Sequence, residues 1–187
     1  MNIKISDIAH LPSRFGTFTV QAFQEGHKEH LVIFKNLSDE VPIVRVHSEC
    51  LTGDALGSLK CDCGDQLAFA LRMIEREGGM VIYLRQEGRD IGLRNKINAY
   101  ALQDTGLNTI EANHQLGFSA DERTYEMVTT ILEHFKIAKI RLLTNNPSKI
   151  SALENIEIVE RLPIVIDANE HNKDYLQVKK DKMGHLI

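Results

Sequence analysis

Three cysteines lie close together in the sequence, at Cys50, Cys61 and Cys63. Thiolates are soft ligands that suit zinc, and three of them leave one position of a tetrahedral ion open for water, as a catalytic site requires. Two alternatives stand beside this one: a closed structural site with His47 as the fourth ligand, and three unrelated buried thiols. Because the number of cysteines is odd, a complete disulfide framework is not expected. The spacing favours a metal site and leaves its kind open.

A second segment that could do chemistry runs from Tyr83 to Arg94 and carries glycines among charged residues. It leads from a predicted strand into a predicted helix, a place where backbone N–H groups can meet a phosphate. Arginine suits phosphate binding because its planar fork can grip the oxygens in pairs. The local cations are Arg85, Arg89, Arg94 and Lys96. The segment is not a Walker A loop, so it indicates either an anion site of another kind or a solvated charged turn.

Two further segments are weaker signals. Residues 143–149 again lead from a strand into a helix, and Thr144 and Lys149 could help to hold a nucleotide there. The same residues could serve only as turn and cap residues. Asp121 and Arg123 place a carboxylate and a guanidinium near a predicted helix start, where acidic residues are expected for capping alone.

The elements that must position these residues follow from the hydrophobic pattern. From Gly64, apolar residues recur at helical spacing, and Gly78-Gly79 ends that helix. The other expected elements are strands over 42–48, 80–84, 140–143, 156–159 and 162–166, and helices opened by Asp90, by a capping box at 119–122 and by Pro147. Strands that alternate with helices predict an α/β domain. The polar tail over 169–187 yields no predicted element.

Composition narrows the class of protein. The 187 residues fit one domain, and a net charge of −4 excludes a generally basic nucleic-acid binder. The sequence has no apolar run near the roughly 20 residues of a membrane helix, and its start does not resemble a secretory signal. We therefore expect a single cytoplasmic domain over 1–187, with a flexible tail from about residue 169 and with neither nucleic acid nor membrane as a partner.

Several ordered blocks of the sequence resemble the GTP cyclohydrolase II family. The blocks are RVHSECLTGD (45–54), CDCG (61–64), RQEGRDIGL (85–93), NKINAYALQ (95–103), EANHQLGF (111–118), ADER (120–123), LLTNNPSK (142–149) and VER (159–161). The resemblance implies an α/β fold with a mixed sheet flanked by helices. It also implies hydrolysis of GTP to 2,5-diamino-6-ribosylamino-4(3H)-pyrimidinone 5′-phosphate, formate and pyrophosphate, the first committed step of riboflavin biosynthesis.

The resemblance also implies roles for individual residues. Cys50, Cys61 and Cys63 would hold one zinc ion per subunit, and Tyr100 would assist the ring chemistry. Asp121 would be a proton acceptor, and Arg123 either a nucleophile or a stabiliser of charge. The implied GTP-binding residues are Arg45, Val46, His47, Ser48, Glu49, Gln66, Glu87, Gly88, Arg89, Thr109, Thr144 and Lys149. Magnesium would accompany the triphosphate, and the protein would be a homodimer.

Two other functions are compatible with the same residues. One is a family member that releases only pyrophosphate or stops at a formamide intermediate. The other is a zinc-stabilised module that binds GTP without turning it over. Tyr100 argues against the first, since the residue for ring chemistry is in place. Asp121 and Arg123 argue against the second.

Overall fold

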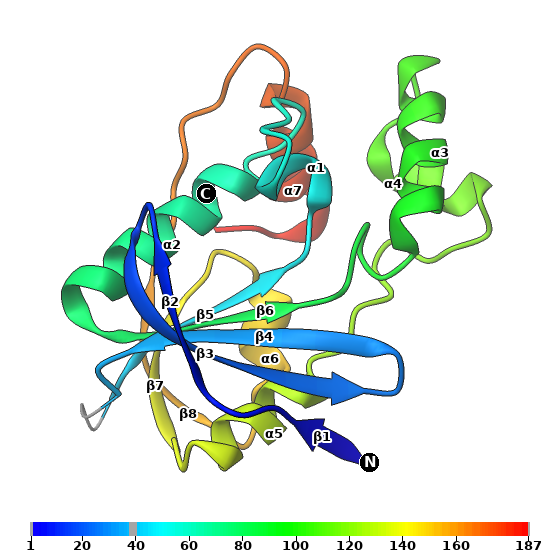
Figure 1. The fold of residues 1–187 in the computed structure, drawn as a ribbon. Helices are drawn as coiled ribbons and strands as arrows, with labels where there is room; N and C mark the ends of the chain where they lie inside the picture. Colours follow the sequence, from blue (N-terminus) through cyan, green and yellow to red (C-terminus); the bar gives the residue numbers. More distant parts are fainter. Residues whose placement is uncertain (1, 38–40, 187) are drawn as a thin grey trace.

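A computed structural model describes residues 2–37 and 41–186 and contains an eight-stranded sheet (Figure 1). Its strands are β1 (Ile3–Ile5), β2 (Ala9–Ser13), β3 (Gly16–Glu25), β4 (Lys28–Lys35), β5 (Ile43–Ser48), β6 (Gly79–Leu84), β7 (Lys139–Leu143) and β8 (Glu157–Leu162). The helices are α1 (Leu51–Asp54), α2 (Cys63–Glu77), α3 (Gly92–Asp104), α4 (Thr109–Gln115), α5 (Glu126–His134), α6 (Pro147–Ser151) and α7 (Lys173–Met183).

The sheet is mixed, in the order β1-β3-β4-β6-β5-β7-β8, with β2 paired to β3 outside this path. The first four strands form antiparallel pairs, and β4 joins them to β6 in an antiparallel ladder. From β6 onward the ladders are parallel, with Val46 opposite Ile82 between β5 and β6. Since β5, β6 and β7 run the same way, the segments that follow them meet at one edge of the sheet.

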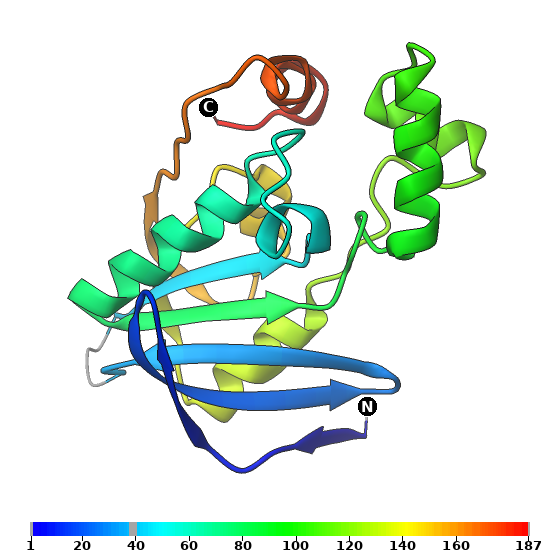
Figure 2. The ribbon, with the colours of Figure 1, turned by 45° about the horizontal axis from the view of Figure 1, so that its top comes forward.

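Helices cover both faces of the parallel half (Figure 2). Successive strand residues point to opposite faces, so neighbours enter different cores. Val81 packs in the cluster that contains Ile74 of α2, whereas Ile82 packs in the cluster that contains Ile131 of α5. Burying these side chains on both faces explains why the central strands read as continuous apolar runs. The expected fold, α/β with a mixed sheet flanked by helices, is confirmed.

Most of the predicted elements are confirmed. The strands over 42–48, 80–84 and 140–143 correspond to β5, β6 and β7, and α2 ends at Gly78, whose φ is +80°. Pro147 occupies the first turn of α6 as predicted, and Asn146 caps that helix by accepting from Ser148 N–H.

Three predictions about the elements are wrong: a helix cap, a helix start and a strand. Asp90 does not cap α3: its φ is +72°, its carboxylate pairs with Lys28, and Ile91 is the N-cap residue. The capping box at 119–122 opens no helix. Glu122 does accept a hydrogen bond from Ser119 N–H, but the chain stays non-helical until α5 begins at Glu126. The strand predicted over 162–166 is absent from the described chain, because Ile164 N–H is bonded to the side chain of Asn145 instead of to a strand.

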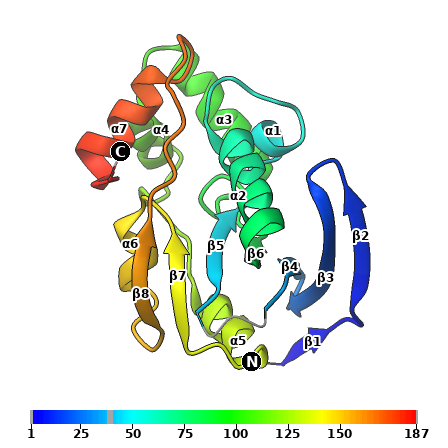
Figure 3. The same ribbon diagram turned by 90° about the vertical axis from the view of Figure 1, so that its left-hand side faces the viewer.

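Several elements had no counterpart among the predictions. They are the four N-terminal strands, the short helices α1 and α4 and the tail helix α7. Helix α4 begins with a capping box in which Asn108 accepts from Glu111 N–H and Glu111 accepts from Asn108 N–H. In Figure 3, α7 lies above α6. The end of the tail is bonded to the segment before α6, because Leu186 N–H donates a hydrogen bond to the carbonyl of Asn145. In the part of the chain that the structure describes, no helix is both long and apolar enough to cross a bilayer.

Candidate active site

A cleft opens where the parallel strands β5, β6 and β7 end. In open α/β sheets, ligands bind outside the carboxyl ends of the strands, so its position is that of a substrate site. The predicted residues that line it are Arg45, His47, Ser48, Glu49, Cys50, Cys61, Cys63, Gln66, Glu87, Gly88, Arg89, Tyr100, Thr109, Arg123, Thr144 and Lys149. Residues from widely separated stretches of the chain thus meet in one cleft.

Four residues that the sequence singled out do not line the cleft. Val46 is buried in β5, where its carbonyl accepts a hydrogen bond from Lys149 Nζ at 2.7 Å. Asp121 lies behind Arg123, to which it is paired. Arg85 forms an exposed ion pair with Glu49, and Arg94 is exposed on α3. The prediction that Arg85 and Arg94 supply cations to this site is therefore wrong.

The three cysteine sulfurs gather at one end of the cleft, all within 4.8 Å of one another. Cys50 precedes α1, and Cys63 is the first residue of α2. The Sγ atoms of Cys50 and Cys61 are 3.7 Å apart. Two sulfurs bound to the same tetrahedral zinc at about 2.3 Å would be about 3.8 Å apart. The three thiols therefore lie together in the structure, in a cluster that could hold a metal ion.

Glycines give the cluster its room. A Cβ atom on Gly53 would lie 2.9 Å from Cys61 Sγ and 3.2 Å from Cys50 Sγ. A Cβ atom on Gly64 would lie 2.3 Å from the carbonyl oxygen of Gly53, so only glycine lets α1 and α2 approach this closely. The two helices are thus packed so that their cysteines converge.

His47 is not a fourth ligand of this cluster. Its Nε2 lies 3.1 Å from Asp54 Oδ1, and its ring stacks on that of Tyr83. Burial is the main reason that the pKa of His47 is lowered, although the hydrogen bond with Asp54 opposes it. Among the described residues, the group that could hold a metal ion consists of the three cysteines alone, which does not favour the closed site with His47.

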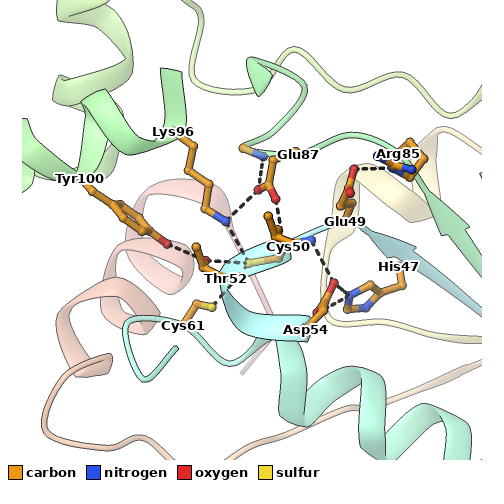
Figure 4. Close-up of polar contacts among 12 residues, drawn as sticks. His47, Glu49, Cys50, Thr52, Asp54, Cys61, Arg85, Glu87, Lys96 and Tyr100 are labelled. Carbon is orange, nitrogen blue, oxygen red and sulfur yellow. Dashed lines mark hydrogen bonds and ion pairs between the residues drawn. The ribbon is translucent and has the colours of Figure 1, made fainter. Parts of the chain in front are cut away.

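Asp54 holds this end of the cleft together, and the sequence predictions missed it (Figure 4). Its carboxylate accepts from Cys50 N–H at 2.9 Å and from the Tyr83 hydroxyl at 2.7 Å, besides its contact with His47. Only 7% of its side chain is exposed, and a buried carboxylate needs such partners. The clue was its spacing: Asp54 lies four residues after Cys50, where a side chain on α1 can bond back to Cys50 N–H.

Lys96 and Glu87 form a second buried contact with the cluster (Figure 4). Lys96 Nζ lies 3.1 Å from Cys50 Sγ and 2.7 Å from Glu87 Oε1, and the other Glu87 oxygen accepts from Leu51 N–H. Burial opposes the charge on Lys96, but its bond with Glu87 and the charge of Cys50 outweigh this and raise its pKa. Hydrogen bonds from Cys61 and Cys63, followed by the charge of Lys96, lower the pKa of Cys50, so the cluster carries a thiolate.

Tyr100 connects α3 with the cysteine cluster. Its hydroxyl is 3.3 Å from Thr52 Oγ1, which in turn is 3.7 Å from Cys50 Sγ. Lys60 and Lys96 both lie near the face of its ring, at 5.0 and 5.7 Å from the centroid. Burial raises the pKa of Tyr100, so its hydroxyl stays protonated at neutral pH and can donate a hydrogen bond.

Cations also line the cleft. Arg45 is buried in β5, where it donates to the carbonyl of Leu143 at 3.1 Å and to Gln66 Oε1 at 2.6 Å. Burial lowers the pKa of Arg45 to about 10, so it remains charged at neutral pH. Lys149 and Arg89 also line the cleft, and the Arg89 guanidinium donates a hydrogen bond to the carbonyl of Ala120. This concentration of positive charge suits an anionic ligand, although the whole chain is acidic.

Arg123 is a buried cation held by Asp121. Its Nε donates to Asp121 Oδ1 at 2.8 Å and its Nη2 to Asp121 Oδ2 at 2.5 Å, which makes a two-bond pair. Burial disfavours charge on both groups, but their mutual hydrogen bonds outweigh it, lowering the pKa of Asp121 and raising that of Arg123. Arg123 therefore faces the cleft as a guanidinium ion.

Lys96, which the sequence analysis named among the local cations, also lines the cleft. Other lining residues were not singled out as site residues: Gln86, Gln103, Asn113, Asn145, Asn146, Tyr175, His185, Lys60 and Ile164. Tyr175 and His185 belong to the polar tail, which returns to the sheet edge only through tertiary contacts such as that of Leu186 with Asn145. No local pattern could have indicated them.

Comparisons with known proteins show which family the chain resembles. The sequence model described as GTP cyclohydrolase II matches residues 4–163. A GTP cyclohydrolase-2 from Campylobacter hominis is 65% identical over 187 residues, covering 100% of this chain and 97% of the relative. One from Helicobacter pylori (strain Shi470) is 58% identical over 189 residues, covering 99% and 98%.

A solved structure also resembles the chain. It is a two-domain 3,4-dihydroxy-2-butanone 4-phosphate synthase from A. baumannii, with a TM-score of 0.47 and 18% identity, covering 88% of this chain and 40% of that one. The sequence relatives, by contrast, are matched over nearly their full length. The chain therefore belongs to the GTP cyclohydrolase II family, a family of hydrolases.

Proposed function

We propose that this protein is a zinc-dependent GTP cyclohydrolase II that converts GTP to 2,5-diamino-6-ribosylamino-4(3H)-pyrimidinone 5′-phosphate, formate and pyrophosphate. This would be the first committed step of riboflavin biosynthesis. The observation that carries the proposal is the composition of the cleft: three thiols that fit a metal ion and a separate set of cations line the same cavity. Such a cleft has chemistry for both ends of a nucleoside triphosphate.

At the base end, Cys50, Cys61 and Cys63 would hold zinc, one ion per subunit, with a coordination position left over. Zinc bound there would supply Lewis acidity that makes water a nucleophile near neutral pH. Tyr100 then has a defined role, because its protonated hydroxyl can donate to the guanine imidazole ring as C8 is attacked. Asp54 would orient Cys50 through its backbone N–H, and Lys96 would balance the negative charge of the Cys50 thiolate.

At the phosphate end, Arg45, Lys149, Arg89 and Arg123 would share the negative charge of the triphosphate, with Mg²⁺ bound to its oxygens. The other residues that we propose for GTP binding are Val46, His47, Ser48, Glu49, Gln66, Glu87, Gly88, Thr109 and Thr144. Ser48 accepts a hydrogen bond from Arg123 at 3.4 Å. A phosphate group could replace this weak contact, which leaves Arg123 available to the ligand.

We propose that Arg123 stabilises charge in the transition state and does not act as a nucleophile. A nucleophilic guanidinium would have to lose a proton, whereas its pairing with Asp121 raises its pKa. Asp121, whose pKa is lowered by the same pairing, is a poor base for that proton. The residue that the family resemblance implies as a proton acceptor is therefore better described as the partner that positions Arg123.

Substitutions of Arg123 separate the two roles. Arg123→Lys keeps the positive charge and should slow pyrophosphate release about 10- to 100-fold, whereas Arg123→Gln removes the charge and should slow it about 10³-fold. Initial rates at saturating GTP measure both. If Arg123 were the nucleophile, the bond from its Nη to Pα would form as pyrophosphate leaves, and intact-mass spectrometry during turnover would find a GMP adduct on the wild-type protein. Such an adduct would overturn the charge-stabilising role.

Gly53 provides a test of the zinc site that leaves its ligands in place. Gly53→Ala would put a methyl group 2.9 Å from Cys61 Sγ, so we expect zinc affinity to fall about 10- to 100-fold. Titration against a chromophoric chelator measures this affinity. Gly57→Ala is the control, because a Cβ atom there meets nothing within 4 Å. The φ of Gly57 is +66°, so this variant also shows the effect of a strained backbone alone. Equal zinc affinity in both variants would mean that the cluster is not the zinc site.

The remaining features of the proposal concern the whole protein. We infer that residues 1–187 act as a single domain, because strands from both halves of the chain share a sheet. We propose a homodimer, as the family resemblance implies. A reducing compartment such as the cytoplasm suits a protein whose three cysteines serve as ligands.

A further inference from the structure

We propose that Lys28 and His30, near the turn of the β3–β4 hairpin, are positioning residues that hold the loop of residues 85–92 in its ligand-binding conformation. This loop follows β6 and carries Glu87 and Arg89 at the cleft. In Figure 2 the hairpin turn lies on the same side of the sheet as the segment that leads from β6 to α3. The inference rests on the proposed function for the identity of the ligand, GTP.

The loop has a backbone that needs support. Gly88, Arg89 and Asp90 are consecutive residues with φ of +65°, +62° and +72°, and Gly92 follows at +82°. Glycine adopts this left-handed region freely, whereas it is unfavourable for arginine and only occasionally adopted by aspartate. Strained residues persist only where the surroundings over-determine them. Contacts from outside the loop must therefore stabilise Arg89 and Asp90.

Lys28 makes one of these contacts. Its Nζ lies 2.5 Å from Asp90 Oδ1 and 2.7 Å from Asp90 Oδ2, an ion pair whose side chains are 31% and 20% exposed. The pair joins the first residue of β4 to a strained residue 62 positions later in the chain. It is the contact from the hairpin that acts on the strained part of the loop directly.

His30 fixes the start of the same loop. The last ladder pair between β4 and β6 on this side is Leu31 with Tyr83. Beyond it, Arg85 N–H donates to His30 Nδ1 at 3.0 Å, so a side chain continues the bonding where the ladder ends. His30 is 2% exposed, and its ring position is set by the packing around it. Together the two residues contact the loop at its first residue, Arg85, and at the strained residue Asp90.

Other contacts hold Arg89 from the opposite side. Glu122 N–H donates to the Arg89 carbonyl at 3.2 Å, and Arg89 Nη1 donates to the carbonyl of Ala120. Neither contact reaches Asp90. Loss of Lys28 should therefore loosen the part of the loop around Asp90 and lower the fraction of molecules that can bind GTP. Apparent affinity falls in proportion to that fraction, whereas the bound complex reacts as before.

The first test compares Lys28→Met with Lys35→Met, a matched control. Lys35 forms a similar ion pair from β4, to Glu75 of α2 at 2.6 Å, with 28% and 31% exposure, but it does not contact the loop. We expect Lys28→Met to raise the KM for GTP about tenfold with kcat changed less than about threefold. Hydrogen exchange should quicken in residues 86–92. Lys35→Met should leave all of these unchanged. Identical behaviour of the two variants would overturn the proposal.

A double substitution shows whether Lys28 acts through the backbone strain. Asp90→Gly removes both the strain and the carboxylate, so adding Lys28→Met to Asp90→Gly should have no further effect on KM. If Lys28→Met still raised KM about tenfold in that background, Lys28 would act on the ligand directly and the positioning role would be wrong. His30→Asn keeps a hydrogen-bond acceptor near the position of Nδ1, so the KM for GTP should stay close to the wild-type value. His30→Leu removes the acceptor, so the KM should rise. An equal rise in both would overturn the role of His30.

Failure of the proposed function would look different. A wild-type protein that released neither formate nor pyrophosphate would contradict the cyclohydrolase. The hydrogen-exchange comparison of Lys28→Met with Lys35→Met needs no substrate, so it would still decide whether the hairpin holds the loop.

Discussion

Cys61→Ser is expected to reduce formate release by about 10³-fold or more, the largest effect of any single substitution proposed for this protein. Cys61 is buried, and its Sγ lies 3.7 Å from that of Cys50. A serine hydroxyl is a hard, neutral donor and a poor replacement for a zinc thiolate. Since zinc contributes several kcal/mol to transition-state stabilisation, its loss corresponds to a factor of this size.

The measurement combines zinc content with the rate of formate production. Leu59→Ser is the control: it introduces the same residue type two positions earlier, at a side chain that is 58% exposed and does not line the cleft. It should keep both zinc and activity. If the Cys61→Ser protein lost zinc but still released formate at the wild-type rate, zinc would not be needed for the reaction.

Tyr100→Phe is expected to separate the two products. The hydroxyl lies beside Thr52, next to the cysteine cluster, whereas Arg123, which we assign to the phosphate end, is paired with Asp121. Loss of a proton donor costs about 10²-fold or more, so formate release should fall by that factor. Pyrophosphate release should fall less than about tenfold, because the cations of the cleft are unchanged.

Both products are followed in the same reaction, and zinc content is measured as an internal control. The Tyr100 hydroxyl does not contact a cysteine directly, so zinc should be retained. Equal loss of formate and pyrophosphate would contradict the division of the cleft into a base end and a phosphate end. Tyr83→Phe offers a contrast, because its hydroxyl bonds Asp54 and its removal should instead weaken zinc binding.

Local sequence patterns were sufficient for the central part of the fold. The β-branched run of β5 and the helical spacing after Gly64 are strong because both elements are buried against the sheet. The cysteines could be assigned to one cluster because Cys50 comes just after β5, whereas Cys61 and Cys63 come just before and at the start of α2. The contact of Lys96 with Cys50 depends on how α3 packs, which no pattern encodes, whereas the bond from Cys50 N–H to Asp54 follows from a spacing of four residues.

The errors have physical causes of the same kind. Asp90 has the residue type of a helix cap, but Lys28 from a distant hairpin binds its carboxylate and the backbone there is left-handed. The box at 119–122 forms one of its two hydrogen bonds, yet the chain must stay extended to bring Arg123 to the cleft. The tail reaches the site through contacts with Asn145. In each case a tertiary contact outweighs local propensity.

The most direct test of the proposed function is to incubate the zinc-loaded protein with GTP and magnesium and to measure formate and pyrophosphate in the same tube. We predict equal amounts of the two products. Pyrophosphate without formate would show that only the phosphate end works, as in a family member that stops early. Neither product, with GTP bound stoichiometrically, would contradict the enzyme and indicate a nucleotide-binding module instead.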